Sequence, residues 1–269
     1  MIHIVTALLH EARPIIDLYS LKPAQSDPYQ IYQNDQISLI VSGVGKQNSK
    51  DAVTYLYEYS GKKRNCAWLN FGIGGHAKKK LGEALFLAHK ITDQKTGKSW
   101  YPPRILKSVW PSEIVLTVET VEDKYEGNFI YDMEAAGFYE AASSYSVSEL
   151  VQCLKIVSDN LTSPAKRVTG SLVRTLISKQ LHAIDSVVKE MGELSDRLLT
   201  LESPLEESVL FLKHWHFTVT ESHQLRSLLG RLKTLAPEKK WFSAAAGCSK
   251  AKQVIEFLEK QIQSIPVRL

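Results

Sequence analysis

Three carboxylates in this sequence stand beside apolar runs, where their spacing could bring them together to move protons. Glu11 ends the segment Ala7-Leu8-Leu9-His10-Glu11, Glu134 lies in Tyr131-Asp132-Met133-Glu134-Ala135-Ala136, and Asp159 lies in Ile156-Val157-Ser158-Asp159-Asn160. A fourth segment, Asn70-Phe71-Gly72-Ile73-Gly74-Gly75, joins a strand-like run to glycines. Ligands of open α/β sheets bind at the carboxyl ends of strands, so we expect these segments to meet at one sheet edge. Carboxylates placed in this way are candidates for acid–base chemistry.

The order and approximate spacing of these segments, over residues 1 to about 194, resemble the nucleoside phosphorylase and nucleosidase superfamily. The nearest branch is that of the methylthioadenosine/adenosylhomocysteine nucleosidases and futalosine hydrolases. The resemblance implies that Glu11 activates the attacking water, and that Asp159 binds the purine N7 and protonates the leaving base. It also implies that Glu134 holds the ribose hydroxyls while Met133 packs against the sugar. The remaining residues expected to bind substrate are Val44, Gly72, Ile73, Gly74, Asp132 and Ser158.

The chemistry of an N-glycoside requires such a set of side chains. The bond breaks through an oxocarbenium-like state, so one group must neutralise the departing base while another presents the nucleophile. Asp159 must therefore carry or share a proton near neutral pH, whereas Glu11 must stay ionised to accept one. We expect hydrolysis of a purine-type nucleoside to free base and pentose, with no metal or organic cofactor. The resemblance also implies a homodimer in which the partner borders the 5′ side of the pocket.

Two rival functions remain open. The first is a nucleoside phosphorylase of the same fold, in which a serine of the glycine loop and arginines hold phosphate; Ile73 occupies that place here and favours hydrolysis. The second is a non-catalytic nucleoside-binding protein. Each carboxylate also has an ordinary structural reading: Glu134 could compensate a helix dipole, Asp159 could form a turn, and Glu11 could be an exposed helical residue.

Strand-like and helical patterns alternate through the first part of the chain, which predicts an α/β fold. The expected strands are Ile2–Ala7, Ile37–Val41, Cys66–Phe71, Glu83–Ala88, Ile114–Thr120 and Leu150–Val157. The expected helices are Asn48–Tyr59, Asp132–Ser143 and Thr169–Leu194, and Thr92–Pro103 is expected to be irregular. The resemblance makes this a three-layer phosphorylase-like fold with a central mixed, twisted sheet. We expect Lys95–Pro103 to cover the 5′ side of the pocket.

The pattern changes after about Leu194. Three further segments have helical periodicity, namely Leu198–Leu212, Thr220–Leu235 and Lys250–Ile265, separated by Pro204, Pro237 and Gly247. A short strand could occupy His216–Thr220. We therefore predict an α/β domain over residues 1–194 and a helical C-terminal extension over residues 195–269.

Composition limits the remaining function classes. A net charge of +4 is weak support for a nucleic-acid partner, although a basic helix face leaves that role open for the extension. Three scattered cysteines lack metal-ligand spacing, and the residues around His214-Trp215-His216 and His223 complete no recognisable ligand set. No leader-like start and no run of ~20 apolar residues is visible, so we expect a cytoplasmic protein without a membrane partner.

Overall fold

The structure of the protein is a computed structural model that describes residues 1–107, 110–122, 124–202 and 206–265. Contacts between residues divide the chain into two compact units, Met1–Leu198 and Leu199–Leu269. Each unit has its own hydrophobic core, so each is described by itself.

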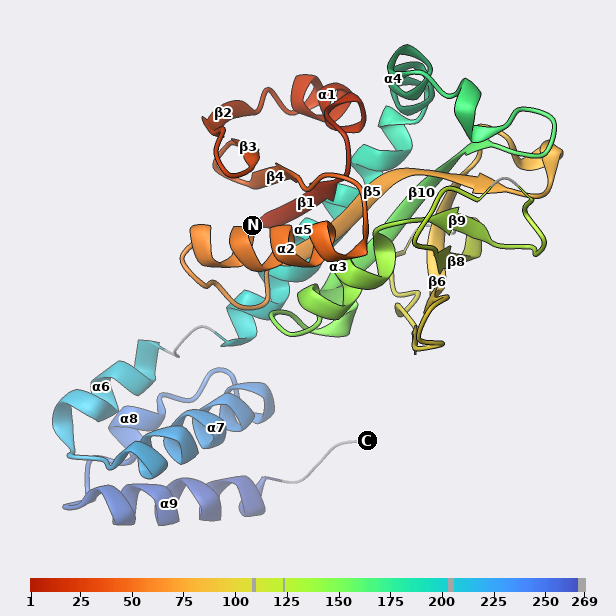
Figure 1. The fold of residues 1–269 in the computed structure, drawn as a ribbon. Coiled ribbons are helices and arrows are strands. Elements are labelled where there is room, and N and C mark those ends of the chain that lie inside the picture. The colour runs from red at the N-terminus through yellow and green to blue at the C-terminus, as the bar shows by residue number, and fades with distance from the viewer. Residues whose placement is uncertain (108–109, 123, 203–205, 266–269) are drawn as a thin grey trace. The chain divides into compact units, whose positions relative to one another are not determined.

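The first unit contains the strands, the first four helices and most of the fifth helix (Figure 1). Its strands are β1 (Ile2–Thr6), β2 (Lys22–Gln25), β3 (Gln30–Gln33), β4 (Ile37–Val41), β5 (Ala67–His76), β6 (Leu85–Asp93), β7 (Ser99–Trp100), β8 (Ser112–Thr117), β9 (Ile130–Asp132) and β10 (Val151–Asp159). Its helices are α1 (Leu9–Leu18), α2 (Lys46–Tyr59), α3 (Ala135–Ala142), α4 (Gly170–Lys179) and α5 (Leu181–Glu202).

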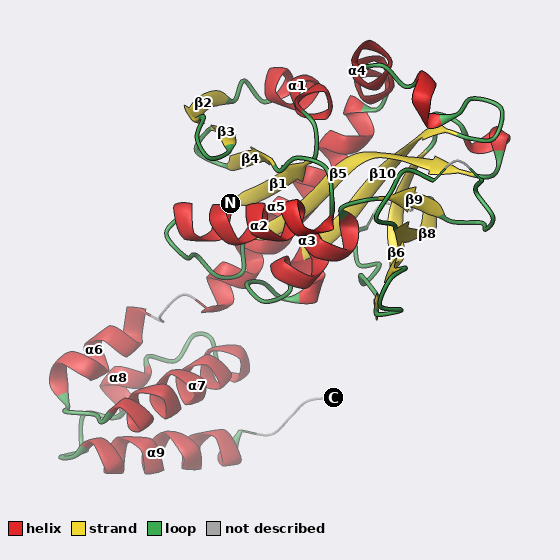
Figure 2. Cartoon of the chain, viewed as in Figure 1, coloured by secondary structure: helices red, strands yellow, loops and turns green. Residues whose placement is uncertain are grey.

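The strands form one mixed sheet, as predicted (Figure 2). β1 lies between β4 and β5 with parallel pairing to both, and β3 and β2 extend the sheet beyond β4 through antiparallel pairs. β5 continues in parallel to β10, which pairs antiparallel with β6. The sheet then returns to β5 through β8 and β9, so these five strands close into a ring. Closure brings the ends of β5, β9 and β10 together.

Helices cover both faces of the sheet, because successive side chains of a strand point to opposite faces. Ile4, Leu39 and Leu69 belong to one core with residues of α1, α4 and α5. Their neighbours Val5, Ile40 and Trp68 belong to a second core with residues of α2 and α3. Burial on both faces explains why the strands read as continuous apolar runs. The prediction of a three-layer α/β fold is confirmed.

The end of one expected strand and the start of one expected helix were wrong near the carboxyl edge. Gly72–Gly75 is not a loop after a strand; β5 runs through it to His76, in parallel register with β10. Glycine is needed there because β9 crosses closely, and a Cβ at Gly74 would lie 2.6 Å from the Ile130 side chain. Asp132 ends strand β9, and Glu134 is the N-cap of α3, not a residue of its first turn.

Two further segments differ from the prediction. Thr92–Pro103 is not wholly irregular, because β7 turns back and pairs antiparallel with the end of β6. Thr169–Leu194 is not a single helix, since α4 ends at Lys179 and α5 begins at Leu181. Gln180, between the two helices, donates a hydrogen bond from its side-chain amide to the Glu83 carbonyl. This bond fixes the point where α4 ends and α5 begins.

The second unit is helical, as the sequence predicts. Its helices are α6 (Glu206–His214), α7 (Val219–Leu235), α8 (Trp241–Ala244) and α9 (Ala251–Ser264), and Pro204 lies outside the described residues. The suggested strand at His216–Thr220 was wrong, because Thr218 caps α7 and exchanges hydrogen bonds with Glu221 in a capping box. The His214 ring packs on Trp215 and Phe242 inside this unit. Over the residues described in both units, no helix is long and apolar enough to cross a membrane.

Candidate active site

A cavity of about 200 Å³ opens at the carboxyl ends of β1, β5, β9 and β10. It collects residues from segments that are far apart in the sequence. The predicted site residues that line it are Glu11, Val44, Ile73, Gly74, Asp132, Met133, Glu134, Ser158 and Asp159. Gly72 lies behind the wall, beneath Glu11. The structure thus brings the predicted residues together, while their chemical roles stay predictions.

Glu11 is held by backbone amides from two directions. Its Oε2 accepts from Ala7 N and Leu8 N, both at 2.9 Å, which caps the start of α1. Its Oε1 accepts from Ile73 N of β5 at 3.0 Å. The bond to β5 goes beyond a local helix cap, and it fixes the carboxylate against the cavity wall. Only 3% of the residue is exposed, so the prediction's alternative of an exposed helical glutamate is wrong.

Gly72 makes this placement of Glu11 possible. A Cβ at Gly72 would lie 2.8 Å from Glu11 Oε1, so any side chain there would displace the carboxylate. Burial raises the pKa of Glu11, although Lys155 and the three amide hydrogen bonds oppose the shift. A buried carboxylate with raised proton affinity is suited to accept a proton.

Glu134 lies where two helices begin. It is the N-cap of α3, and its Oε1 accepts a hydrogen bond of 2.8 Å from Gly45 N at the start of α2. Burial raises the pKa of Glu134 to about 7. The charges of Asp132 and Glu11 add to the effect, whereas Lys155 and the Gly45 amide oppose it. Glu134 therefore changes charge near neutral pH.

Lys155 is a buried cation that the sequence analysis missed. It lies within the apolar run of β10, is 1% exposed, and its Nζ lies 2.8 Å from Asp132 Oδ2. Burial acts to lower the pKa of Lys155, but the ion pair with Asp132 outweighs burial and raises it. The feature of the sequence that marks Lys155 is a single lysine among apolar strand residues, shortly before Ser158-Asp159.

Asp132 holds the backbone around the site in place. Its Oδ1 accepts from Thr117 Oγ1 at 2.7 Å, and its Oδ2 accepts from Glu134 N and Ala135 N as well as from Lys155. These internal donors fill the carboxylate, so Asp132 fixes the start of α3 and thereby Glu134. It lines the cavity, as predicted.

Asp159 lies at the end of β10 with a hydroxyl on each oxygen. Ser158 Oγ donates to Oδ1, and the Tyr125 hydroxyl donates to Oδ2. Tyr125 is 3% exposed and its ring packs against Gly75, where a Cβ would lie 2.4 Å from the ring. The sequence analysis did not identify Tyr125, against which Tyr131 packs edge-on at 5.7 Å between ring centroids.

The predicted cover for the 5′ side was wrong. Lys98 and Trp100, within Lys95–Pro103, line a separate cavity with Lys46 and Glu140. The main cavity is bounded instead by Leu8, Val44 and Val121, together with Ala165 and Val168 before α4.

Several solved nucleosidase structures have a similar fold. A futalosine hydrolase mutant of Helicobacter pylori superposes with a TM-score of 0.58 and 16% identity, over 70% of this chain and 98% of that one. A methylthioadenosine/adenosylhomocysteine nucleosidase of Colwellia psychrerythraea, solved with adenine, gives 0.56 and 14% over 72% and 95%. The Streptococcus pneumoniae nucleosidase with a transition-state inhibitor gives 0.56 and 15% over 72% and 99%.

The first unit has the phosphorylase/nucleosidase fold. No protein-family model and no curated protein matches the sequence. At these identities the likeness establishes the fold alone, which is the fold that the sequence motifs predicted.

Proposed function

We propose that this protein is a nucleosidase that hydrolyses the N-glycosidic bond of a purine-type nucleoside, with methylthioadenosine, adenosylhomocysteine and futalosine-like compounds as candidate substrates. The observation that carries the proposal is the pairing of Glu11 and Asp159 in one cavity of the nucleosidase fold. Among the residues that the structure describes, Glu11 accepts hydrogen bonds from backbone amides alone, whereas Asp159 accepts them from hydroxyls. Two carboxylates in different surroundings are what an acid–base pair requires.

In the proposed reaction, a water oxygen bonds to the anomeric carbon while the bond from that carbon to the base nitrogen breaks. Glu11 takes the proton of the attacking water at Oε1, which accepts a single backbone hydrogen bond and so keeps an acceptor position, whereas Oε2 already accepts two. Asp159 delivers a proton to the departing base, so that the base leaves neutral. No cofactor is required, because both proton transfers use side chains of this chain.

Glu134 would bind the sugar. As an ionised carboxylate it accepts hydrogen bonds from two neighbouring hydroxyls and favours the positive charge that develops on the ring. The Lys155 cation would favour ionised Glu134, and Asp132, which accepts a hydrogen bond from the Glu134 amide, would keep the residue oriented when substrate binds.

The cavity lining favours water over phosphate as the nucleophile. Phosphate sites are normally built from arginine, lysine or clustered backbone donors. The described residues that line the cavity include neither lysine nor arginine, and Ile73 is apolar. Lys155 lies deeper, against Asp132.

The residues at the cavity mouth bear on the 5′ substituent of the substrate and on the oligomeric state. Leu8, Val44 and Val121 are 37%, 43% and 65% exposed, which is unusual for apolar residues gathered at one opening. An apolar 5′ substituent and the second subunit of a homodimer would both cover them. Sedimentation of the protein with and without nucleoside would test the dimer.

Chromatographic measurement of base release tests the function. Methylthioadenosine, adenosylhomocysteine, futalosine, inosine and adenosine would each be incubated with the protein, with and without phosphate. Release that is independent of phosphate supports the proposal and names the substrate. Release that requires phosphate would establish a phosphorylase instead, and no release from any compound would favour the nucleoside-binding alternative.

A further inference from the structure

The loop before α2 ends in Gly45, whose backbone amide holds Glu134. Residues 42–45 connect β4 to α2, and Gly45, the N-cap of α2, makes no side-chain cap hydrogen bond. Its φ of +111° suits glycine and leaves its N–H directed at Glu134 Oε1, 2.8 Å away. Among the residues that the structure describes, this amide is the one hydrogen-bond donor to the Glu134 carboxylate. The orientation of Glu134 therefore depends on where this loop is anchored.

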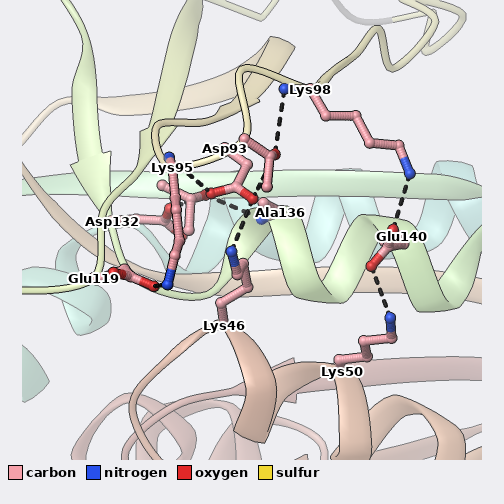
Figure 3. A network of polar contacts seen from close by, with 11 residues as sticks. Lys46, Lys50, Asp93, Lys95, Lys98, Glu119, Asp132, Ala136 and Glu140 are labelled. Carbon is pink, nitrogen blue, oxygen red and sulfur yellow. Dashed lines mark hydrogen bonds and ion pairs between the residues drawn. The ribbon is translucent and has the colours of Figure 1, made fainter.

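Lys46 anchors the loop on its far side (Figure 3). Its Nζ lies 2.8 Å from Asp93 Oδ2 at the end of β6. The Asp93 side chain is 6% exposed and also accepts from Thr96 Oγ1 at 2.8 Å and from Lys95 N at 3.3 Å. Burial acts to raise the pKa of Asp93, but the hydrogen bonds from Lys46 and Thr96 outweigh it and lower that pKa. This is a fixed, ionised partner, unlike the exposed pairs that contribute little.

The backbone of Lys46 is equally constrained. A Cβ added at Gly137 would lie 2.0 Å from the Lys46 carbonyl oxygen. α3 therefore packs directly on the first residue of α2. On the sheet, Asp93 is the register neighbour of Thr117, and Thr117 is the register neighbour of Asp132. Thr117 Oγ1 donates to Asp132 and accepts from Ala136 N of α3. One row of strand ends thus holds both Lys46 and the start of the helix that carries Glu134.

We propose that the Lys46–Asp93 ion pair is a positioning pair, which fixes the Gly45 N–H against Glu134 and so orients the carboxylate toward the sugar hydroxyls. The sugar-binding part rests on the proposed function, whereas the positioning itself does not.

The chain supplies a matched control one helical turn away. Lys50 of α2 pairs with Glu140 of α3, which also pairs with Lys98 (Figure 3). Lys50→Met removes the same charge from the same helix, but this pair contacts neither Gly45 nor Glu134. Lys46→Arg keeps the cation, and Asp93→Asn supplies a second way to break the pair if Lys46→Met fails to fold.

Hydrogen exchange of the Gly45 amide tests the positioning directly. Protein labelled with ¹⁵N-glycine would be followed by NMR, with the Gly45 signal assigned from its shift in Glu134→Gln. Lys46→Met and Asp93→Asn should speed exchange of this amide by about tenfold or more, because it opens from its acceptor more often. Lys46→Arg and Lys50→Met should leave it near the wild-type rate. An unchanged rate in both pair-breaking variants would overturn the proposal.

The kinetic arm uses the best substrate from the base-release panel. Lys46→Met should lower kcat/KM by roughly tenfold, on the scale of a misplaced binding group, and Lys46→Arg should recover most of the loss. In a Glu134→Gln background Lys46→Met should add little, since the group that it positions is already lost. A full additional loss would show that Lys46 acts elsewhere. A wild-type protein that cleaves no nucleoside would end the proposed function, while Gly45 exchange would still decide the positioning.

Discussion

At the residue scale, the site depends on carboxylates that the fold buries in unequal surroundings. Burial raises the pKa of Glu134 to about 7 from an ordinary value of 4.5. The negative charges of Asp132 and Glu11 act in the same direction, whereas the Lys155 cation opposes the shift. Both substrate binding and stability should therefore change with pH near neutrality.

We predict opposite effects of pH on stability and on activity. The folded state favours protonated Glu134, so that contribution is complete below about pH 4.5 and is lost as pH rises through about 7. From about pH 5 to about pH 8, the wild type should lose roughly 1 to 3 kcal/mol of unfolding free energy relative to Glu134→Gln. Over the same range kcat/KM should rise, because ionised Glu134 accepts the sugar hydroxyls. Denaturant unfolding at several pH values measures the difference, and parallel curves for the two proteins would refute it.

Tyr125 provides the second prediction at this scale. Its hydroxyl occupies an Asp159 oxygen that the proposed mechanism reserves for the base. Tyr125→Phe should therefore lower KM by about fivefold, the equivalent of one hydrogen bond of about 1 kcal/mol that no longer has to be displaced. Tyr19→Phe, which removes a tyrosine–aspartate hydrogen bond to Asp185 outside the cavity, is the control. If kcat fell while KM stayed unchanged, Tyr125 would instead act within the enzyme–substrate complex.

Some residues of this site could be predicted from the sequence, and others could not. Glu11, Glu134 and Asp159 stand in short segments whose order is recognisable, so they could be placed in one cavity in advance. Lys155 and Tyr125 could not, because their importance comes from partners distant in sequence, Asp132 and Asp159. Their local patterns, a strand interior and a polar loop, indicate no such contacts.

At the element scale, the predicted fold was accurate where strands are buried on both faces. Ile37–Val41 was placed correctly because four of its five residues are large and apolar. The β2–β3 hairpin was missed because it lies at the sheet edge, where Lys22 and Gln30 are exposed and no apolar run forms. The end of α4 was missed because apolar spacing continues through Gln180 into α5.

The contact between α2 and α3 gives a prediction for a whole element. Gly137→Ala would place a Cβ 2.0 Å from the Lys46 carbonyl, so α3 must move away from α2. We expect a loss of about 1 to 3 kcal/mol of stability, as for other overpacked sites, together with reduced kcat/KM because Glu134 begins α3. Gly230→Ala on α7 is the control, since nothing lies within 4 Å of its added Cβ. It should raise stability by about 0.5 to 1 kcal/mol. Equal thermal shifts in the two variants would contradict this account.

At the scale of the whole molecule, the chain consists of two units with separate cores. The described residues that line the cavity all belong to the first unit. A chain truncated after Glu202, which keeps α5 intact, should therefore fold cooperatively and release base within about threefold of the full-length rate. Circular dichroism and the same chromatographic assay would check both points. An inactive but folded truncated chain would show that the helical extension takes part in catalysis.

The most direct test of the account is the rate of base release by Glu11→Gln and Asp159→Asn, measured without phosphate beside the wild type. Both side chains line the cavity, and the mechanism gives them the two proton transfers. Each variant should lose about 10²-fold or more in kcat while still unfolding cooperatively. Asp185→Asn, a carboxylate that also accepts a tyrosine hydroxyl but lies outside the cavity, should keep wild-type turnover. Wild-type rates in either Glu11→Gln or Asp159→Asn would contradict the central claim.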